Sequence, residues 1–363
     1  MSDLFFKRPD LETFCTGIFQ ALGLPPEDSV DAGRILVSAD ARGIRSHGLA
    51  HVKRYVDGIR AGFISADVNI TTIYETPLSL VLDAEGSVGL GISRRAMDKA
   101  IEKAAAHGIG VCSVRNSNHF GIAGYYTEMA ARQDMIGIAL TNTAALGVPT
   151  FARSAWFGTN PIACAVPALD GKMFSLDMAT TTVTRGTVEV YAQEKKLLPA
   201  GWAVGTDGLY TQDPVQLLED ILYLRGGGLL PLGGEGTVAG GYKGYGLAVL
   251  VDILCALTSG GTFGSAVRDS AVTSARVCHF FMAIRLDLFR PPEEFKKDMT
   301  KMLDELASLD PADGQSRVFY AGLRSHETES RYTKTGIPLA PKTWDILKKI
   351  AAELHIPVPC PIH

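Results

Sequence analysis

The six cysteines of this 363-residue chain form no CxxC pair. Their scattered spacing is typical of separate reduced thiols rather than of a disulfide framework or a zinc knuckle. Basic residues are not in excess, and with a net charge of -4 the chain has no electrostatic reason to bind nucleic acid or an anionic membrane. The most apolar run, residues 246–258, is interrupted by Asp252 and is too short to cross a bilayer. Because the first residues also lack the apolar core of a signal peptide, we expect a soluble cytoplasmic protein.

The glycine fingerprint of a Rossmann domain is also missing. No GxGxxG follows an early strand, and residues 86–91 read Gly-Ser-Val-Gly-Leu-Gly, which is the reverse spacing. A Rossmann dinucleotide domain is therefore not supported. Tandem repeats and low-complexity segments are absent, and the length indicates more than one lobe.

Hydrophobic periodicity predicts helices at both ends of the chain and mixed structure between them. Residues 10–62 read as helical, and residues 78–83 resemble a strand followed by a helix over 93–107. From 109 to 185, short β-rich runs alternate with glycine and proline turns. The tail from residue 292 is predicted to be helical at both ends, with a loop over 313–336. We therefore expect an α/β fold in which residues 1–75 and 291–363 form one helical lobe beside an α/β region over 76–290.

A polar stretch around His119 follows an apolar, β-branched run. Residues 109–114 read as a strand, 116–121 as a glycine-bearing bend, and the residues after it as a helix. Enzymes of the α/β class place catalytic groups at such strand ends. An imidazole carries protons near neutral pH, and Asn118 beside it offers a donor and an acceptor. The same residues are also typical of a turn whose side chains satisfy only backbone groups.

Ser46, His47, His51 and Tyr55 form a second polar group at a predicted helix start. Free backbone N–H groups there favour anions, and a spacing of four residues puts the histidines and the tyrosine on one face. Such a stripe could bind and protonate a small polar substrate, and a capping serine beside a solvated polar face is the equal alternative. The histidine spacing also matches a zinc pair. The residues between lack the glutamate base of a zinc hydrolase, so we expect no metal.

Two further stretches have residues suited to ribose or phosphate. Asp177 to Thr182 ends a predicted strand with hydroxyls and one carboxylate, although turns have a similar composition. Residues 240–246, Gly-Gly-Tyr-Lys-Gly-Tyr-Gly, precede a helix, where Lys243 would attract a phosphate or carboxylate. This stretch is not a P-loop, because no Ser or Thr follows the lysine.

Taken in order along the chain, seven motifs resemble one family, the malate/L-lactate dehydrogenases of the second type. That family includes ureidoglycolate, sulfolactate and 2,3-diketogulonate dehydrogenases and the cyclic-imine reductases. The motifs are Ser46-His47-Gly48 with Tyr55, Asn116 to Gly121, Thr141-Asn142, Gly158 to Pro161, Asp177 to Thr180, Gly201 to Val204 and Gly241 to Gly246. The resemblance implies hydride transfer between NAD(P)H and a small malate- or lactate-like 2-oxo or 2-hydroxy acid. It also implies a non-Rossmann α/β fold with a mixed sheet, and a homodimer with active sites close to the subunit interface.

Individual roles follow from the same resemblance. His47 and His119 match the two histidines for which proton transfer is proposed in different members, with Ser46 as a further catalytic candidate. His51, Tyr55 and Asn118 are the substrate-binding candidates. NAD or NADP is expected to lie against the matched cofactor-binding positions, which are Thr143, Asp177, Met178, Ala179, Thr181, Thr182, Lys243, Gly244 and Gly322.

Three departures from the family pattern bear on these roles. The family usually reads Ser-His-Gly-x-x-Arg, and His51 stands in the place of that arginine. Histidine is neither always charged nor bidentate, and Arg54, three residues further on, could reach over in its place from a different helical face. Many members carry Pro-Gly-Glu where this chain has Ala321-Gly322-Leu323, and Thr143 replaces a common serine while keeping the hydroxyl.

Two other function classes remain open from the sequence. A metal-dependent hydrolase or lyase would use the pair His47 and His51, and a catalytically silent dinucleotide-binding protein would account for the departures at His51 and Leu323. The sequence favours the dehydrogenase over both. It does not distinguish among malate, lactate, sulfolactate, ureidoglycolate and cyclic imino acids as substrates, or NAD from NADP.

Overall fold

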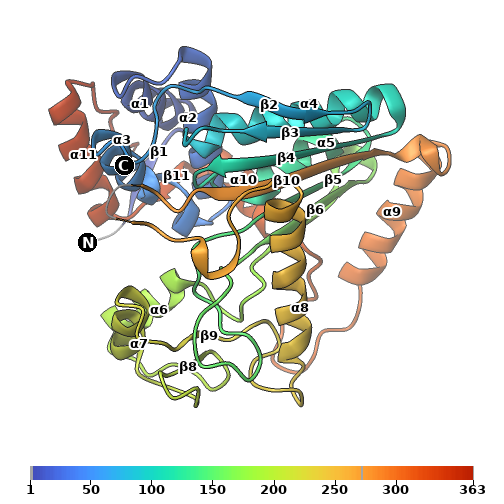
Figure 1. Cartoon of the computed structure of the whole chain (residues 1–363). Coiled ribbons are helices and arrows are strands. Elements are labelled where there is room, and N and C mark those ends of the chain that lie inside the picture. The colour runs from blue at the N-terminus through green and yellow to red at the C-terminus, as the bar shows by residue number, and fades with distance from the viewer. Residues whose placement is uncertain (1–2, 271–272, 363) are drawn as a thin grey trace.

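A seven-stranded mixed sheet forms the centre of the computed structural model, which describes residues 3–270 and 273–362 (Figure 1). Across the sheet the strands are β2 (Thr71–Glu75), β3 (Ser79–Asp83), β4 (Ile109–Ser117), β10 (Val277–Arg285), β5 (Met135–Thr141), β6 (Ile162–Pro167) and β7 (Met173–Met178). Strands β3 and β4 run parallel, and every other neighbouring pair is antiparallel. A Rossmann sheet is parallel, so the expected non-Rossmann α/β fold with a mixed sheet is confirmed.

Helices cover both faces of this sheet. Helices α4 (Gly89–His107) and α5 (Ala123–Ala131) pack on one face and contribute small apolar side chains to the main core. Close packing depends on Gly110 in β4, because a Cβ there would lie 2.0 Å from the Ala100 carbonyl oxygen of α4. On the other face lie α8 (Gly241–Asp252) and the π-helical turn Ile253–Leu257 that continues it.

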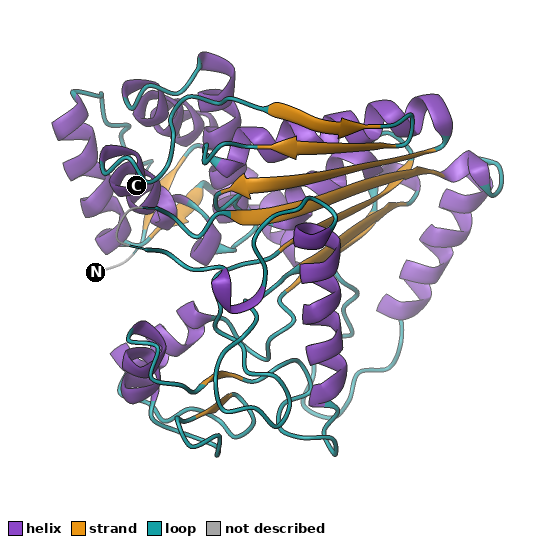
Figure 2. Ribbon diagram, viewed as in Figure 1, coloured by secondary structure: helices purple, strands orange, loops and turns teal. Residues whose placement is uncertain are grey.

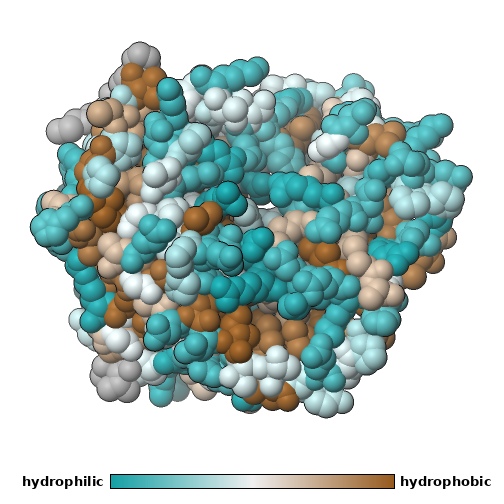
Figure 3. Space-filling model, turned by 90° about the horizontal axis from the view of Figure 1, so that it is seen from above, coloured by the Kyte–Doolittle hydropathy of each residue, from teal (hydrophilic) through white to brown (hydrophobic). Residues whose placement is uncertain are grey.

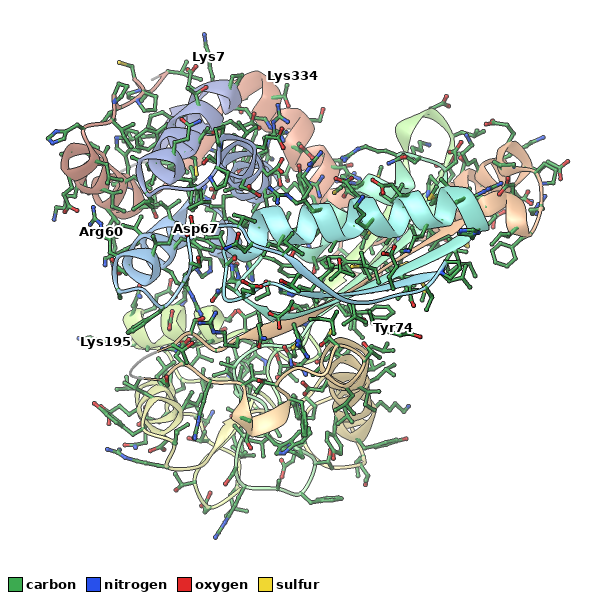
Figure 4. The ribbon with its side chains drawn as sticks, turned by 45° about the horizontal axis from the view of Figure 1, so that its top comes forward. Lys7, Arg60, Asp67, Tyr74, Lys195 and Lys334 are labelled. Atoms are coloured by element: carbon green, nitrogen blue, oxygen red, sulfur yellow. The ribbon has the colours of Figure 1, made fainter. Side chains whose placement is uncertain are left out.

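The two ends of the chain meet in a helical lobe at one end of the sheet (Figure 2). Its helices are α1 (Arg8–Ala21), α2 (Pro26–Ala41), α3 (Val52–Arg60), α10 (Leu323–Thr335) and α11 (Pro341–Leu354). The short strands β1 (Leu4–Phe6) and β11 (Ile337–Leu339) pair antiparallel, and the ring centroids of Phe6 and Trp344 are 4.4 Å apart. Figure 4 accordingly shows Lys7 and Lys334 at the same end of the lobe.

A smaller lobe lies below the sheet in Figure 1. It contains α6 (Arg185–Gln193), α7 (Pro214–Leu222) and the pair β8 (Ala203–Val204) and β9 (Gly228–Leu229), packed around their own apolar cluster. Helix α9 (Pro292–Ala307) packs beside the 3-10 turn Leu169–Gly171. The other 3-10 turns are Arg45–His47, Leu49–His51, Gly264–Ala266 and Leu286–Leu288.

One sequence expectation is wrong: most of the segment predicted as a loop over 313–336 is helix α10. Helix α10 has no buried residues, so it lacks the apolar stripe that pattern reading detects. Charged contacts hold it instead. Glu329 pairs with Arg8 and Arg42, and His326 lies 3.2 Å from Glu128.

The outer surface carries polar and apolar residues side by side. Figure 3 shows hydrophilic side chains over most of the face seen from above, with apolar groups between them. The edge strand β2 is exposed along its whole length, and Tyr74 points away from the sheet in Figure 4. Within the described ranges, none of the helices combines the length and the apolar character needed to span a bilayer.

Candidate active site

The segment predicted to start a helix forms two consecutive 3-10 turns between α2 and α3. Gly48 separates the turns, and Asp40 of α2 lies beneath them, where its Oδ2 accepts a 2.7 Å hydrogen bond from the Leu49 N–H. A Cβ at Gly48 would lie 2.2 Å from that same oxygen, so only glycine fits. Burial raises the pKa of Asp40 to about 7, against the lowering effect of the Leu49 hydrogen bond. Asp40 therefore positions the turns that carry Ser46, His47 and His51.

Three imidazole rings meet above these turns, although one comes from a distant part of the chain. The centroid distances are 5.6 Å from His47 to His119, 4.7 Å from His51 to His119, and 5.8 Å from His47 to His51. The predicted convergence of His47 and His119 is confirmed. The prediction that His47, His51 and Tyr55 share one face of a helix is not how they are placed. His47 and His51 lie in the two 3-10 turns before α3, and Tyr55 lies in α3 itself.

Tyr55 fixes the orientation of His119. Its buried hydroxyl lies 2.7 Å from His119 Nδ1 and 3.1 Å from the His119 carbonyl oxygen, and the Gly121 N–H donates to Nδ1 at 3.3 Å. Because a backbone N–H can only donate, Nδ1 is an acceptor, and the proton of the neutral ring sits on Nε2. His119 thus presents an N–H donor on the side away from Tyr55.

Burial keeps the three rings neutral at pH 7. It lowers the pKa of His47, lowers the pKa of His51 to about 4, and lowers the pKa of His119 well below its usual value. The neighbouring histidines and Arg54 lower the pKa of His51 and His119 further. Ser46 is exposed and lies 2.9 Å from His47 Nδ1. The cluster is therefore a set of neutral donors and acceptors next to a hydroxyl.

Sequence reasoning missed a fourth histidine that supports the strand end carrying His119. His279 of β10 is fully buried, with its ring nitrogens 2.7 Å from Thr141 Oγ1 and 2.8 Å from Ser117 Oγ. Its ring stacks on Phe120 at 4.6 Å, and burial lowers its pKa to about 3. Its position inside an apolar strand gave no sign of this role. The apolar pattern predicts only a core residue there.

Asn118, a predicted substrate-binding residue, faces the backbone of another loop. Its amide nitrogen donates to the carbonyl oxygens of Gly86 at 2.8 Å and Ser87 at 3.0 Å, and the residue is buried. These bonds join the end of β4 to the loop before α4. The structure thus gives Asn118 a supporting role beneath His119.

Asp177 connects the histidine cluster to the segments expected to bind the cofactor. It stands near the end of β7, and its Oδ2 accepts a 2.8 Å hydrogen bond from the Gly124 N–H in the first turn of α5. Helix α5 begins four residues after His119. Asp177 itself is exposed at this strand end. Met178 and Ala179 follow directly at the strand end, with partly accessible side chains.

Gly322 runs beside the same strand. The Ser175 N–H donates to the Ala321 carbonyl oxygen at 3.0 Å, and a Cβ at Gly322 would lie 2.8 Å from the Ser175 Cβ. Although the loop departs from the Pro-Gly-Glu of many family members, it still packs closely against β7 at Ser175.

The threonine positions are linked by a series of backbone contacts. Thr143 Oγ1 accepts from the Thr159 N–H at 2.9 Å, and the Thr180 N–H donates to the Thr159 carbonyl oxygen at 2.9 Å. The segment Thr180–Thr182 pairs in turn with residues 230–232, where the Leu232 N–H donates to the Thr180 carbonyl oxygen at 2.8 Å. A Cβ at Gly244 would lie 2.3 Å from the Leu232 carbonyl oxygen, which puts the start of α8 against this segment.

Lys243 is exposed in the first turn of α8. Its Nζ lies 5.8 Å from the centroid of the Tyr242 ring, and Gly240 before the helix has a positive φ of 86°. Backbone contacts therefore connect the predicted threonine positions to the start of α8, the helix that carries Lys243.

Asp252 is a second buried carboxylate that sequence reasoning missed. It accepts hydrogen bonds from Asn142 Nδ2 at 2.9 Å and Asn160 Nδ2 at 3.1 Å. These asparagines stand beside Thr143 and Thr159, so Asp252 ties the far end of α8 to both threonine segments. Two of the family-like motifs, Thr141-Asn142 and Gly158 to Pro161, contain its partners.

A charged hollow of about 460 Å³ opens beside β7 and α10. Arg42 makes a bidentate pair with Glu128 at 2.8 and 2.6 Å, and both line the hollow together with Lys172 and His326. Against the effect of burial, the hydrogen bond to His326 and the charge and hydrogen bonds of Arg42 lower the pKa of Glu128 to about 2. This network joins α2, α5 and α10 next to Asp177.

Known proteins match this chain over nearly its whole length. The family model described as malate/L-lactate dehydrogenase matches residues 6–348. The malate dehydrogenase of Pyrococcus abyssi is 42% identical over 96% of this chain and 94% of the relative. The L-sulfolactate dehydrogenase of Methanocaldococcus jannaschii is 35% identical over 97% and 98%.

Solved structures show the same relationship. The malate dehydrogenase of Entamoeba histolytica has a TM-score of 0.94 and 32% identity, covering 99% of this chain and 100% of that one. The malate dehydrogenase of Pyrococcus horikoshii has a TM-score of 0.89 and 38% identity, covering 98% and 97%. These relatives are dehydrogenases, and the hydrolase alternative built on His47 and His51 has no support among them. The chain therefore belongs to the malate/L-lactate dehydrogenase family, which confirms the class of oxidoreductase and the nicotinamide cofactor expected from its motifs.

Proposed function

We propose that this protein reduces a small malate- or lactate-like 2-oxo acid to the 2-hydroxy acid, and catalyses the reverse reaction, with NAD or NADP. The observation that carries the proposal is the meeting of His47 and His119, 72 positions apart in sequence, at a ring distance of 5.6 Å next to the Asp177 segment. Malate and sulfolactate, named in the relatives, are the first substrates to test.

The donor set suits a dinucleotide. Hydroxyls of Thr143, Thr181 and Thr182 and the carboxylate of Asp177 match the needs of ribose, and Lys243 at a helix start matches those of a pyrophosphate. The backbone amides of Met178 and Ala179 would be further donors, and Gly244 and Gly322 allow the close packing of the segments around them. When bound, the nicotinamide supplies the hydride.

Within the chain, the two histidines have different roles in this proposal. His119 donates a hydrogen bond from Nε2 to the substrate carbonyl oxygen, because Nδ1 is already occupied by Tyr55 and Gly121. His47 donates the proton that the developing alkoxide needs, since an anionic substrate nearby favours its charged form. Ser46 holds the His47 ring through Nδ1.

We also propose a cytoplasmic homodimer. All six cysteines are free thiols, as expected in a reducing compartment. Leu250, Ile253 and Leu257 are 45%, 42% and 55% exposed at helical spacing along α8 and its π-helical turn. An exposed apolar stripe of this kind favours contact with a second copy of the chain.

The test is turnover and dinucleotide binding in His47→Ala and His119→Ala. Each change should lower kcat by roughly 10²- to 10⁴-fold, the usual contribution of a general acid, while the Kd of the dinucleotide stays within about twofold. His107→Ala is the matched control, because His107 is exposed at the end of α4. Near-normal turnover in both site variants would contradict the proposal.

A further inference from the structure

The histidine cluster has no permanent positive charge of its own. If the proposed function holds, another residue must supply the charge that binds the substrate carboxylate. A 2-oxo acid carries a carboxylate next to the reacting carbonyl, whereas His47, His51 and His119 are neutral at pH 7. A carboxylate is bound best by a fixed cation that can donate hydrogen bonds to it. The inference below rests on the proposed function and concerns the source of that cation.

Arg54 is placed to provide it. It lies in the first turn of α3, three residues after His51, which precedes that helix, and directly before Tyr55. Its side chain is 50% exposed, so it stands at the rim of the cluster rather than beneath it. Burial is the main cause of the lowered pKa values of His51 and His119, and the charge of Arg54 lowers both further.

The contact that Arg54 makes is weak and leads across the site. Its Nη2 lies 3.9 Å from Asp269 Oδ2, which is longer than a hydrogen bond, and Asp269 is 62% exposed. Asp269 follows Val267, whose carbonyl oxygen accepts from the Ala145 N–H at 3.1 Å. The pair thus extends from α3, which carries Tyr55, toward the segment that carries Thr143.

Lys53 next to it shows a different arrangement. Its ammonium is paired with Asp57 on the same helix, one turn further on. Because that pair lies within α3, Lys53 has no contact across the site, and it provides a matched exposed cation for comparison.

We infer that Arg54 binds the carboxylate of the substrate, and that Asp269 is the counter-ion it leaves when the substrate enters. A guanidinium holds a carboxylate with two parallel hydrogen bonds, and an exposed pair at 3.9 Å is readily exchanged for such a complex. His51 then donates or accepts a neutral hydrogen bond beside the carboxylate. Arg54 thereby selects for acids over neutral carbonyl compounds.

The experiment compares Arg54→Gln, Arg54→Lys, Asp269→Asn and Lys53→Gln with the wild type. The readouts are KM for a 2-oxo acid, kcat, the Kd of the dinucleotide, and the Kd of oxalate, an unreactive carboxylate probe, measured by calorimetry with the dinucleotide bound. Arg54→Gln should raise KM and the oxalate Kd roughly 10- to 150-fold, the range for a hydrogen bond to a charged group. Dinucleotide Kd should stay within about twofold.

The other variants sharpen the test. Arg54→Lys should lose less than Arg54→Gln because it keeps the charge but not the bidentate geometry. Asp269→Asn should lower KM, because it removes the competing carboxylate, and Lys53→Gln should change neither KM nor the oxalate Kd.

An equal oxalate Kd in the wild type and Arg54→Gln would overturn the inference, whether or not turnover is seen. If the wild type reduces no 2-oxo acid, the proposed function fails instead. If His51 in its charged form were the anion receptor, the oxalate Kd would rise steeply with pH and Arg54→Gln would leave it unchanged. Binding through Arg54 predicts a Kd that is flat from pH 6 to 9.

Discussion

Tyr55→Phe tests the account of His119 through a single atom. The change removes the hydroxyl that lies 2.7 Å from His119 Nδ1 and keeps the buried ring that packs against Phe19. Tyr55 is fully buried, so water has little access to replace the lost donor. A buried polar group left without its partner costs about 1–3 kcal/mol, which corresponds to a factor of roughly 5 to 150 in rate if the loss falls on the transition state.

The assay is steady-state oxidation of NADH or NADPH at 340 nm with a 2-oxo acid, together with the free energy of unfolding. Tyr55→Phe should lower kcat within that range, leave the dinucleotide Kd unchanged, and reduce stability by about 1–2 kcal/mol. Tyr74→Phe is the control, because Tyr74 is exposed on the edge strand β2. The reasoning would be refuted by a Tyr55→Phe variant with unchanged kcat and an unchanged pH profile.

Three further predictions concern other parts of the account. Lys243→Ala should raise the dinucleotide Kd about 10-fold or more by fluorescence titration while kcat at saturation changes little, and an unchanged Kd would exclude a phosphate contact. Asp40 has a folded-state pKa raised to about 7, so its contribution to stability is complete below its ordinary pKa and is lost as pH rises through 7. Asp40→Asn removes the titrating carboxyl but keeps an acceptor for the Leu49 N–H. Its unfolding free energy, measured by urea denaturation, should therefore fall less between pH 5 and pH 8 than that of the wild type. An equal fall in both proteins would contradict the raised pKa of Asp40. Ile253→Asp should shift the protein from dimer to monomer in light scattering coupled to size-exclusion chromatography, and a dimer of undiminished stability would place the subunit contact elsewhere.

The motifs predicted the position of the histidine cluster because each contains reactive side chains together with glycines that the local backbone requires. Gly48 is required next to the Asp40 carboxylate, and Gly244 next to the Leu232 backbone, so both glycines mark close approaches near the candidate residues. His119 follows a strand that pattern reading identified over 109–114, and the structure extends it to Ser117. Such positions can be read from one sequence because residue type and spacing are both unusual.

Buried residues that support the site through hydrogen bonds could not be recognised from the sequence. Asp40 lies in a mostly buried helix, and His279 lies in an apolar strand, so each looks like an isolated polar residue until the partner is known. Leu49 lies nine residues from Asp40, outside its helix, and Thr141 and Ser117 lie 138 and 162 residues from His279. Long-range hydrogen bonds of this kind leave no local periodicity.

Domain boundaries are equally hard to place from pattern alone. The sheet already includes Thr71–Glu75, whose residues are all exposed and carry no buried-strand pattern. We retain the division into residues 1–75 with 291–363 and 76–290 as a proposal. Limited proteolysis can test it.

The central claim is that His47, in its protonated form, gives a proton to the 2-oxo acid during reduction and takes it back during oxidation. The most direct measurement is the pH dependence of kcat/KM for reduction and for oxidation, in the wild type and in His47→Ala, across a panel of 2-oxo and 2-hydroxy acids with both dinucleotides. Because the pKa of His47 is lowered, reduction in the wild type should fall as pH rises from 6 to 9, and oxidation should not fall with it. His47→Ala should lose this dependence along with most of its turnover. A His47→Ala variant that keeps the wild-type pH profile and rate would contradict the account.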